Sequence, residues 1–160
     1  MPTIRISQLS RRSWLAEVLG VSVAWSGLAE EKPRDPWTPS KLIEPDALAR
    51  ILNASGAKPT LISVAFPVLY RQRHIAGAVP AGPGSKPEGL ATLREAVSAL
   101  PKDANIVIYC GCCPMEHCPN IRPAYSALET AGFSNVRVLV LRTNLRTDWT
   151  EKGYPVEPSA

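Results

Sequence analysis

Short apolar runs recur along the chain and predict its buried strands. They are brief, partly β-branched and bounded by prolines or polar residues, at 60–64, 105–109 and 136–141. Between them, apolar residues spaced three and four positions apart predict helices at 44–53, at 90–100 and after Asn120. Because the strands are apolar throughout and alternate with helices, they imply a mainly parallel sheet with helices on both faces. The predicted fold class is therefore α/β with a covered central sheet.

Two of these helices carry end signals. Asn120 can accept hydrogen bonds from the first turn of its helix, and Gly132 supplies the stop. The helix at 90–100 is expected to close at Pro101, because proline cannot continue a helix.

Composition fits one compact domain that does not bind nucleic acid. The 160 residues are 45% hydrophobic and 20% charged, which is enough apolar material for a core. The formal net charge is +4, but Arg5, Arg11 and Arg12 lie in the first 29 residues, where Glu17 is the one acidic residue. Residues 30–160 hold 15 basic and 13 acidic groups, and this small excess is no nucleic-acid footprint.

The first 29 residues resemble an export signal. A basic start precedes the mostly apolar stretch 18–29, which ends in the small-residue triplet Gly27-Leu28-Ala29. The segment Ser10-Arg11-Arg12-Ser13-Trp14-Leu15 is similar to the twin-arginine export motif. We expect cleavage after Ala29, a periplasmic location and no membrane span afterwards; if the segment is no signal, a cytoplasmic location, a packed amphipathic helix or an anchor are the alternatives. The chain then divides into signal, proline-rich linker and domain, at 1–29, 30–41 and 42–157.

All four cysteines follow the strand expected at 105–109, in a segment that also holds His117: Cys110, Cys112, Cys113 and Cys118. In a parallel sheet, ligands bind beyond the carboxyl ends of the strands, where the next helix turns its N–H groups toward them. Cys110 occupies that position. A lowered thiol pKa and a nucleophilic role are therefore predicted for Cys110.

From about residue 42 to residue 156 the order of the motifs resembles the rhodanese family of sulfurtransferases. The similar segments are the first core strand 61–64, Tyr70 with the signature-like 74–79, the cysteine strand 106–110, the helix-to-strand passage 131–136, and Trp149 with the closing 153–156. The resemblance implies a rhodanese-like three-layer fold. It also implies a largely structural role for His74, while Trp149 is expected to pack.

The resemblance implies a sulfurtransferase that works through a persulfide on Cys110. A small-molecule donor such as thiosulfate would supply the sulfane sulfur, and a thiol or other nucleophile would accept it. It further implies that Gly111, in the loop around the sulfur, contacts the substrate. Arg122 is a candidate to bind an anionic donor, because guanidinium matches oxyanions, and an exposed helix arginine is the alternative. No cofactor is expected for this activity.

Two departures from the family pattern affect the site. Ser63-Val64-Ala65 stands where the family often has Asp-Val-Arg, so the acidic and basic partners are missing there. The segment from Cys110 to Gly132 is longer than usual, and the surplus lies in the cysteine-rich part. A phosphatase-type Cys-x5-Arg pattern is excluded because Glu116 stands at the arginine position.

The remaining cluster residues, Cys112, Cys113, His117 and Cys118, admit three interpretations. Two thiols can form a disulfide, or one can act as a resolving thiol. Thiolates and His117 can bind a soft metal such as zinc or copper(I). The segment can also be a loop without chemistry. Accordingly, a thiol-redox or soft-metal-binding protein and a non-catalytic rhodanese module remain alternatives to the enzyme.

Overall fold

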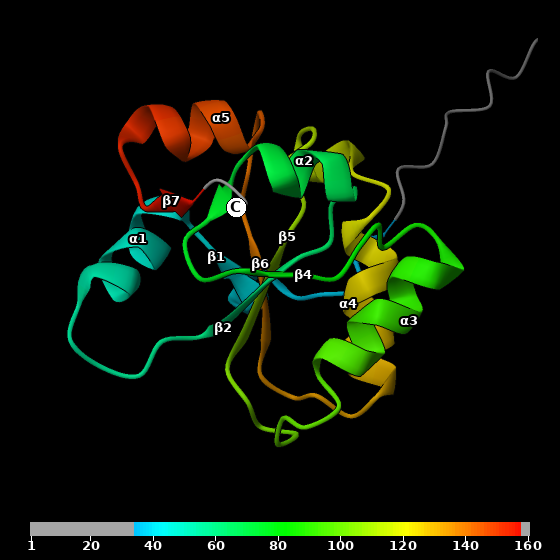
Figure 1. The fold of residues 1–160 in the computed structure, drawn as a ribbon. Helices are drawn as coiled ribbons and strands as arrows, with labels where there is room; N and C mark the ends of the chain where they lie inside the picture. The colour runs from blue at the N-terminus through cyan, green and yellow to red at the C-terminus, as the bar shows by residue number, and fades with distance from the viewer. Residues whose placement is uncertain (1–33, 158–160) are drawn as a thin grey trace, which may run out of the picture. The chain divides into compact units, whose positions relative to one another are not determined.

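The computed structural model describes residues 34–157, and Figure 1 shows their fold. The expected export signal at 1–29 lies outside the described residues and stays a prediction. Among the described residues, no helix combines the length and the apolar character needed to cross a membrane.

A five-stranded sheet forms the centre of the domain. Its strands follow the order β1-β6-β5-β2-β4, and every neighbouring pair is parallel. The bounds are β1 Leu42–Ile43, β2 Thr60–Ser63, β4 Val79–Pro80, β5 Ile106–Tyr109 and β6 Val136–Leu139. The prediction of a mainly parallel sheet is confirmed, and β5 is its middle strand.

Side chains of β5 alternate between two hydrophobic cores, one on each face of the sheet. Ile106 and Ile108 contribute to the first core, while Val107 and Tyr109 contribute to the second. All four are buried, which agrees with the continuous apolar pattern of a strand covered on both faces.

Helices cover both faces, as predicted. Figure 1 shows α3 and α4 together on one side of the sheet and α1 on the other. Their bounds are α1 Pro45–Asn53, α3 Pro87–Ala96 and α4 Ile121–Thr130. Helix α3 begins earlier and ends earlier than the predicted 90–100. Its proline occupies the first turn, where no N–H is needed, and Val97 already has non-helical backbone angles.

A second, two-stranded sheet and two short helices complete the domain. Strands β3 (His74–Ile75) and β7 (Val156–Glu157) pair in antiparallel fashion. The remaining elements are α2 Pro67–Gln72, α5 Leu145–Asp148, and the 3₁₀ turns η1 Pro39–Lys41, η2 Met115–His117 and η3 Thr150–Lys152. Helices α2 and α5 were not predicted, because segments this short carry little periodicity.

The described part of the expected linker packs against the domain. Trp37 is buried, and its ring meets that of Tyr125 edge-on with centroids 5.3 Å apart. Asp35 forms an ion pair of 2.6 Å with Arg122 of α4. The packed domain therefore begins before the expected boundary at Leu42.

Candidate active site

Cys110 lies at the carboxyl end of β5, the middle strand of the sheet. Cys110 is 5% exposed, and its sulfur contacts Cys112 Sγ at 3.1 Å. The side-chain amide Nδ2 of Asn120 donates to Cys110 Sγ at 3.3 Å. The sequence predicted Cys110 at the carboxyl end of the strand 105–109, and the structure has it at the end of β5.

The loop after Cys110 turns sharply at Gly111. Gly111 has a φ of +80°, and a Cβ at this position would lie 2.7 Å from Leu145 Cβ. Its carbonyl accepts a hydrogen bond from Leu145 N at 3.1 Å. Further along, Met115 N donates to Leu141 O at 2.8 Å. The cysteine loop is therefore attached to the segment that follows β6.

Asn120 does not cap α4, contrary to the sequence prediction. It has helical backbone angles and its side chain accepts no bond from the helix. Instead, its Oδ1 accepts from Ser85 N at 3.0 Å while its Nδ2 donates to Cys110. The side chain is fully buried, so these two bonds satisfy an amide that would otherwise be costly to bury. Asn120 joins the loop before α3 to the candidate nucleophile.

Cys118 lies just before α4, where its surroundings favour the thiolate form. Its pKa is lowered to about 6, chiefly because the Cys110 thiol donates to its sulfur. The backbone N–H groups of Asn120 and Ile121 act in the same direction, as expected at a helix N-terminus. Cys118 is nearly inaccessible to solvent.

The pKa of Cys110 is raised, because its thiol donates to Cys118 and because its sulfur is buried. The sequence predicted the opposite shift for Cys110. That prediction is wrong because the enlarged loop brings Cys118, rather than Cys110, to the first N–H groups of α4.

Three sulfur atoms form a compact group. The Sγ atoms of Cys110, Cys112 and Cys118 all lie within 4.8 Å of one another. Cys113 stands outside this group; its sulfur contacts Cys112 at 3.3 Å, and burial raises its pKa to about 12. His117 is exposed in η2 and also stands outside the group. Of the five cluster residues, the structure thus brings three together.

A cavity of about 750 Å³ opens beside Cys110 and Cys112. Its wall combines the ends of β2 and β5 with residues of α2, α5 and η3. Residues that line this wall include Ser63, Ala65, Arg73, Gly111, Leu145, Arg146 and Glu151. Its size is that of a site for an organic molecule rather than for a single small ion.

Two exposed arginines line this wall, Arg73 and Arg146, and neither was predicted as a site residue. Arg146 forms an ion pair of 2.9 Å with Glu151. A signal for Arg146 existed, because it follows the carboxyl end of β6 and so lies at the same edge of the sheet as Cys110. Arg73 directly precedes the signature-like segment 74–79.

Arg122 supports the cysteine loop. Its guanidinium donates to Glu116 O at 3.0 Å and Cys118 O at 3.5 Å, in addition to pairing with Asp35. It is absent from the residues that line the cavity, whereas Gly111 is among them. The structure thus places the predicted substrate arginine behind the loop, and its binding of substrate stays a prediction.

Ser63 and Ala65 line the cavity where charged partners are common in the family. Ser63 hydrogen-bonds to the buried Tyr109, whose hydroxyl accepts from Ile75 N at 3.0 Å. Burial strongly raises the pKa of Tyr109, so this phenol stays neutral. At this end of β2 the hydrogen bonds between neutral groups of Ser63, Tyr109 and Ile75 therefore stand where the family often has an ionised Asp and Arg.

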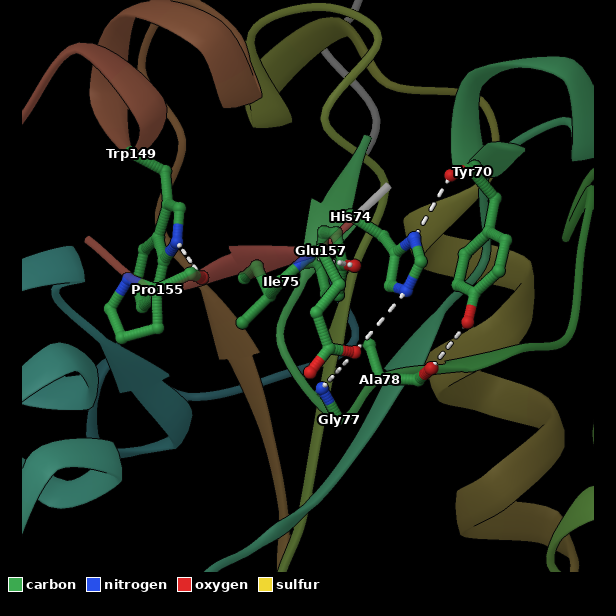
Figure 2. A network of polar contacts seen from close by, with 9 residues as sticks. Tyr70, His74, Ile75, Gly77, Ala78, Trp149, Pro155 and Glu157 are labelled. Atoms are coloured by element: carbon green, nitrogen blue, oxygen red, sulfur yellow. Dashed lines mark hydrogen bonds and ion pairs between the residues drawn. The ribbon is translucent and has the colours of Figure 1, made fainter. Parts of the chain in front are cut away.

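His74 is part of a structural network next to the site (Figure 2). Its ring stacks on Tyr70 with centroids 3.8 Å apart, and its Nδ1 lies 3.0 Å from Tyr70 O. Its Nε2 lies 3.8 Å from a carboxylate oxygen of Glu157, while the hydroxyl of Tyr70 donates to Ala78 O at 2.6 Å. These contacts agree with the structural role expected for His74.

Trp149 is fully buried and donates to Pro155 O at 2.9 Å, as Figure 2 also shows. The prediction that Trp149 packs is confirmed.

A parallel sheet with helices on both faces, and a cysteine at the end of its middle strand, define a rhodanese-like domain. The family model described as rhodanese-like domain matches residues 44–141, and the chain belongs to this family. No curated protein matches the chain.

Solved structures share the fold. The rhodanese-like domain of a protein from Anabaena sp. has 24% identity and a TM-score of 0.55, with 73% of this chain and 78% of that chain covered. A protein from Bacillus halodurans has 20% identity and a TM-score of 0.59, with 75% and 78% covered. A thiosulfate sulfurtransferase from Pseudomonas aeruginosa has 23% identity and a TM-score of 0.57, with 79% of this chain but 21% of that chain covered.

Proposed function

We propose that the protein is a sulfurtransferase that carries a sulfane sulfur as a persulfide on Cys110. One observation supports this most directly: the cysteine at the end of the middle strand lines a cavity and lies in the same group as the Cys118 thiolate. The cavity gives a donor access, and the thiolate gives the Cys110 proton a place to go.

The first half-reaction begins with transfer of the Cys110 proton to the Cys118 thiolate. The Cys110 sulfur then attacks the outer sulfur of thiosulfate, so that one S–S bond forms while the S–S bond of the donor breaks. Sulfite leaves with the electron pair, and a persulfide anion remains on Cys110. The Asn120 N–H contacts the Cys110 sulfur at 3.3 Å and stabilises the charge that develops there.

In the second half-reaction an acceptor thiolate attacks the outer sulfur of the persulfide. The sulfane sulfur passes to the acceptor, and Cys110 recovers its thiol by taking a proton back from Cys118. No net oxidation occurs, and no cofactor is needed.

The charge of the cavity wall favours an anionic donor, because two arginines face one carboxylate, that of Glu151, which pairs with Arg146. Arg73 and Arg146 stand in the wall, and a guanidinium matches sulfonate or carboxylate oxygens in its planar geometry. A volume of about 750 Å³ also leaves room for an organic persulfide carrying carboxylates, beside inorganic thiosulfate.

The mass of the intact Cys112→Ser protein after addition of thiosulfate tests this function. We expect an increase equal to one sulfur atom, mapped by peptide analysis to Cys110, with release of one sulfite per chain. The double variant Cys112→Ser/Cys110→Ser should show neither the added sulfur nor the released sulfite. The matched control, Cys112→Ser/Cys113→Ser, should retain the added sulfur and the released sulfite. Equal sulfur uptake without Cys110 would reject the proposal.

A second candidate function rests on the three-sulfur group. Zinc sites in proteins usually have four ligands, whereas a soft thiolate group of three suits copper(I). The Sγ atoms of Cys110, Cys112 and Cys118 already lie within 4.8 Å of one another.

Titration of the reduced protein with copper(I) tests the metal function. It should saturate at one ion per chain, and saturation should be lost in Cys118→Ser but kept in Cys113→Ser. Saturation that is unchanged in Cys118→Ser would reject a three-sulfur site.

A further inference from the structure

The sulfur of Cys110 is in direct contact with the next cysteine of its own loop. Cys112 Sγ lies 3.1 Å from Cys110 Sγ, and Cys112 is exposed while Cys110 is buried. The left-handed turn at Gly111 folds the loop back so that two cysteines separated by one residue face each other. Both cysteines line the same cavity.

We propose that Cys112 resolves the Cys110 persulfide within the same chain, releasing hydrosulfide and leaving a Cys110–Cys112 disulfide. This step rests on the sulfurtransferase function proposed above. It gives the protein a further activity, the reduction of a sulfane sulfur to sulfide at the expense of two thiols.

The step balances in atoms and electrons. The Cys112 sulfur attacks the inner sulfur of the Cys110 persulfide anion and forms a new S–S bond. The bond between the inner and outer sulfur breaks, and the outer sulfur leaves with the electron pair and the Cys112 proton as hydrosulfide. The sulfane sulfur is reduced by two electrons, and the two cysteines are oxidised to a disulfide.

Contact geometry selects Cys112 over the other two cysteines. Cys113 touches Cys112 and stands outside the group around Cys110. Cys118 belongs to the group but is buried, and its sulfur is held by the first N–H groups of α4. Cys112 combines contact with Cys110 and access from solvent.

Turnover then requires a dithiol reductant, either a small molecule or a redox protein. The reductant attacks the exposed Cys112 sulfur, forms a mixed disulfide and closes its own disulfide, so that both cysteine thiols return. Attack at Cys112 is favoured because Cys110 is shielded in the wall of the cavity.

A single-turnover experiment without an acceptor thiol tests the proposal. The reduced full-length protein, freed of reductant and kept under anaerobic conditions, is mixed with thiosulfate; sulfite, sulfide, free thiols and intact mass are measured. For the wild type we expect one sulfite and one sulfide per chain, loss of two thiols and a mass lower by two hydrogen atoms. Dithiothreitol, as the dithiol probe, should then restore the thiols and permit a second release of sulfide.

Two variants separate the steps. Cys112→Ser should release sulfite, keep one added sulfur on Cys110 and release no sulfide, whereas the matched control Cys113→Ser should behave as the wild type. A stable persulfide on Cys110 of the wild type, a persulfide that moves to Cys112, or a disulfide between another pair would overturn resolution by Cys112. Absence of sulfite and sulfur uptake in every variant would overturn the sulfurtransferase function as well.

Discussion

Replacing Asn120 by alanine removes two hydrogen bonds from one buried side chain, and the two losses affect different properties. The bond to Ser85 N at 3.0 Å holds the loop before α3, so its loss lowers the stability of the domain. The bond to Cys110 Sγ at 3.3 Å contacts the reacting atom, so its loss slows persulfide formation. Because the side chain is fully buried, water cannot simply replace the lost partner.

The expected magnitudes follow from the type of each bond. Leaving the Ser85 N–H without its partner costs about 1–3 kcal/mol in the free energy of unfolding. A hydrogen bond to a charged group contributes about 1.5–3 kcal/mol, so losing it while charge develops on Cys110 slows the first turnover roughly 10- to 150-fold.

Two measurements separate these effects. Urea denaturation under reducing conditions gives the free energy of unfolding, and quenched release of sulfite gives the rate of the first turnover. Leu128→Ala is the control, because this buried core leucine lies near the carboxyl end of α4 whereas Cys118 precedes its first turn; the truncation costs about 2–5 kcal/mol. We expect the control to lower stability while leaving the rate of the folded protein unchanged.

A folded Asn120→Ala protein that releases sulfite at the wild-type rate would contradict this expectation. The Nδ2 contact with Cys110 would then have no influence on the reaction. A rate loss of equal size in Leu128→Ala would also refute it, because the effect would then follow stability rather than the contact.

Four further predictions concern single positions. The rate of sulfite release should fall as the pH drops through about 6, because protonated Cys118 no longer accepts a proton; a pH profile that is flat there would remove Cys118 from the reaction. Gly111→Ala should lower the free energy of unfolding by at least about 1 kcal/mol in urea denaturation, because φ is +80° and the added Cβ collides with α5. Arg122→Lys should cost about 1–3 kcal/mol in the same assay and leave the KM for thiosulfate within about twofold, whereas a large rise in KM would support substrate binding by this side chain. Trp149→Phe should cost about 1 kcal/mol through loss of its indole donor and leave persulfide formation unchanged, which intact mass would check.

The sheet and the position of Cys110 were predictable because both depend on local patterns. The run 106–109 is apolar throughout, and such a run identifies a central buried strand without any knowledge of its neighbours. Once that strand is placed, the rule for parallel sheets locates the residue after it at the ligand-binding edge. The position of Cys110 could therefore be predicted from its place in the sequence directly after this strand.

The rest of the site depends on contacts between distant segments. Asn120 looked like a helix cap because its sequence position allows that role, but a partner 35 residues away, Ser85, takes its oxygen instead. The pKa of Cys118 is lowered because the enlarged loop carries this residue to the first N–H groups of α4. The length and composition of the loop do not predict which of its thiols lies at the start of α4.

The Cys110 sulfur and the helical part of the cavity wall, formed by α2, α5 and η3, lie on segments that differ in local stability. Every side chain of β5 is buried, whereas α2, α5 and η3 contain no buried side chain. Segments with little buried surface open at low free energy, while a central strand opens near the limit of global unfolding. Hydrogen exchange should therefore be faster in α2, α5 and η3 than along β5, so these three segments can open while the backbone that carries the Cys110 sulfur keeps its place.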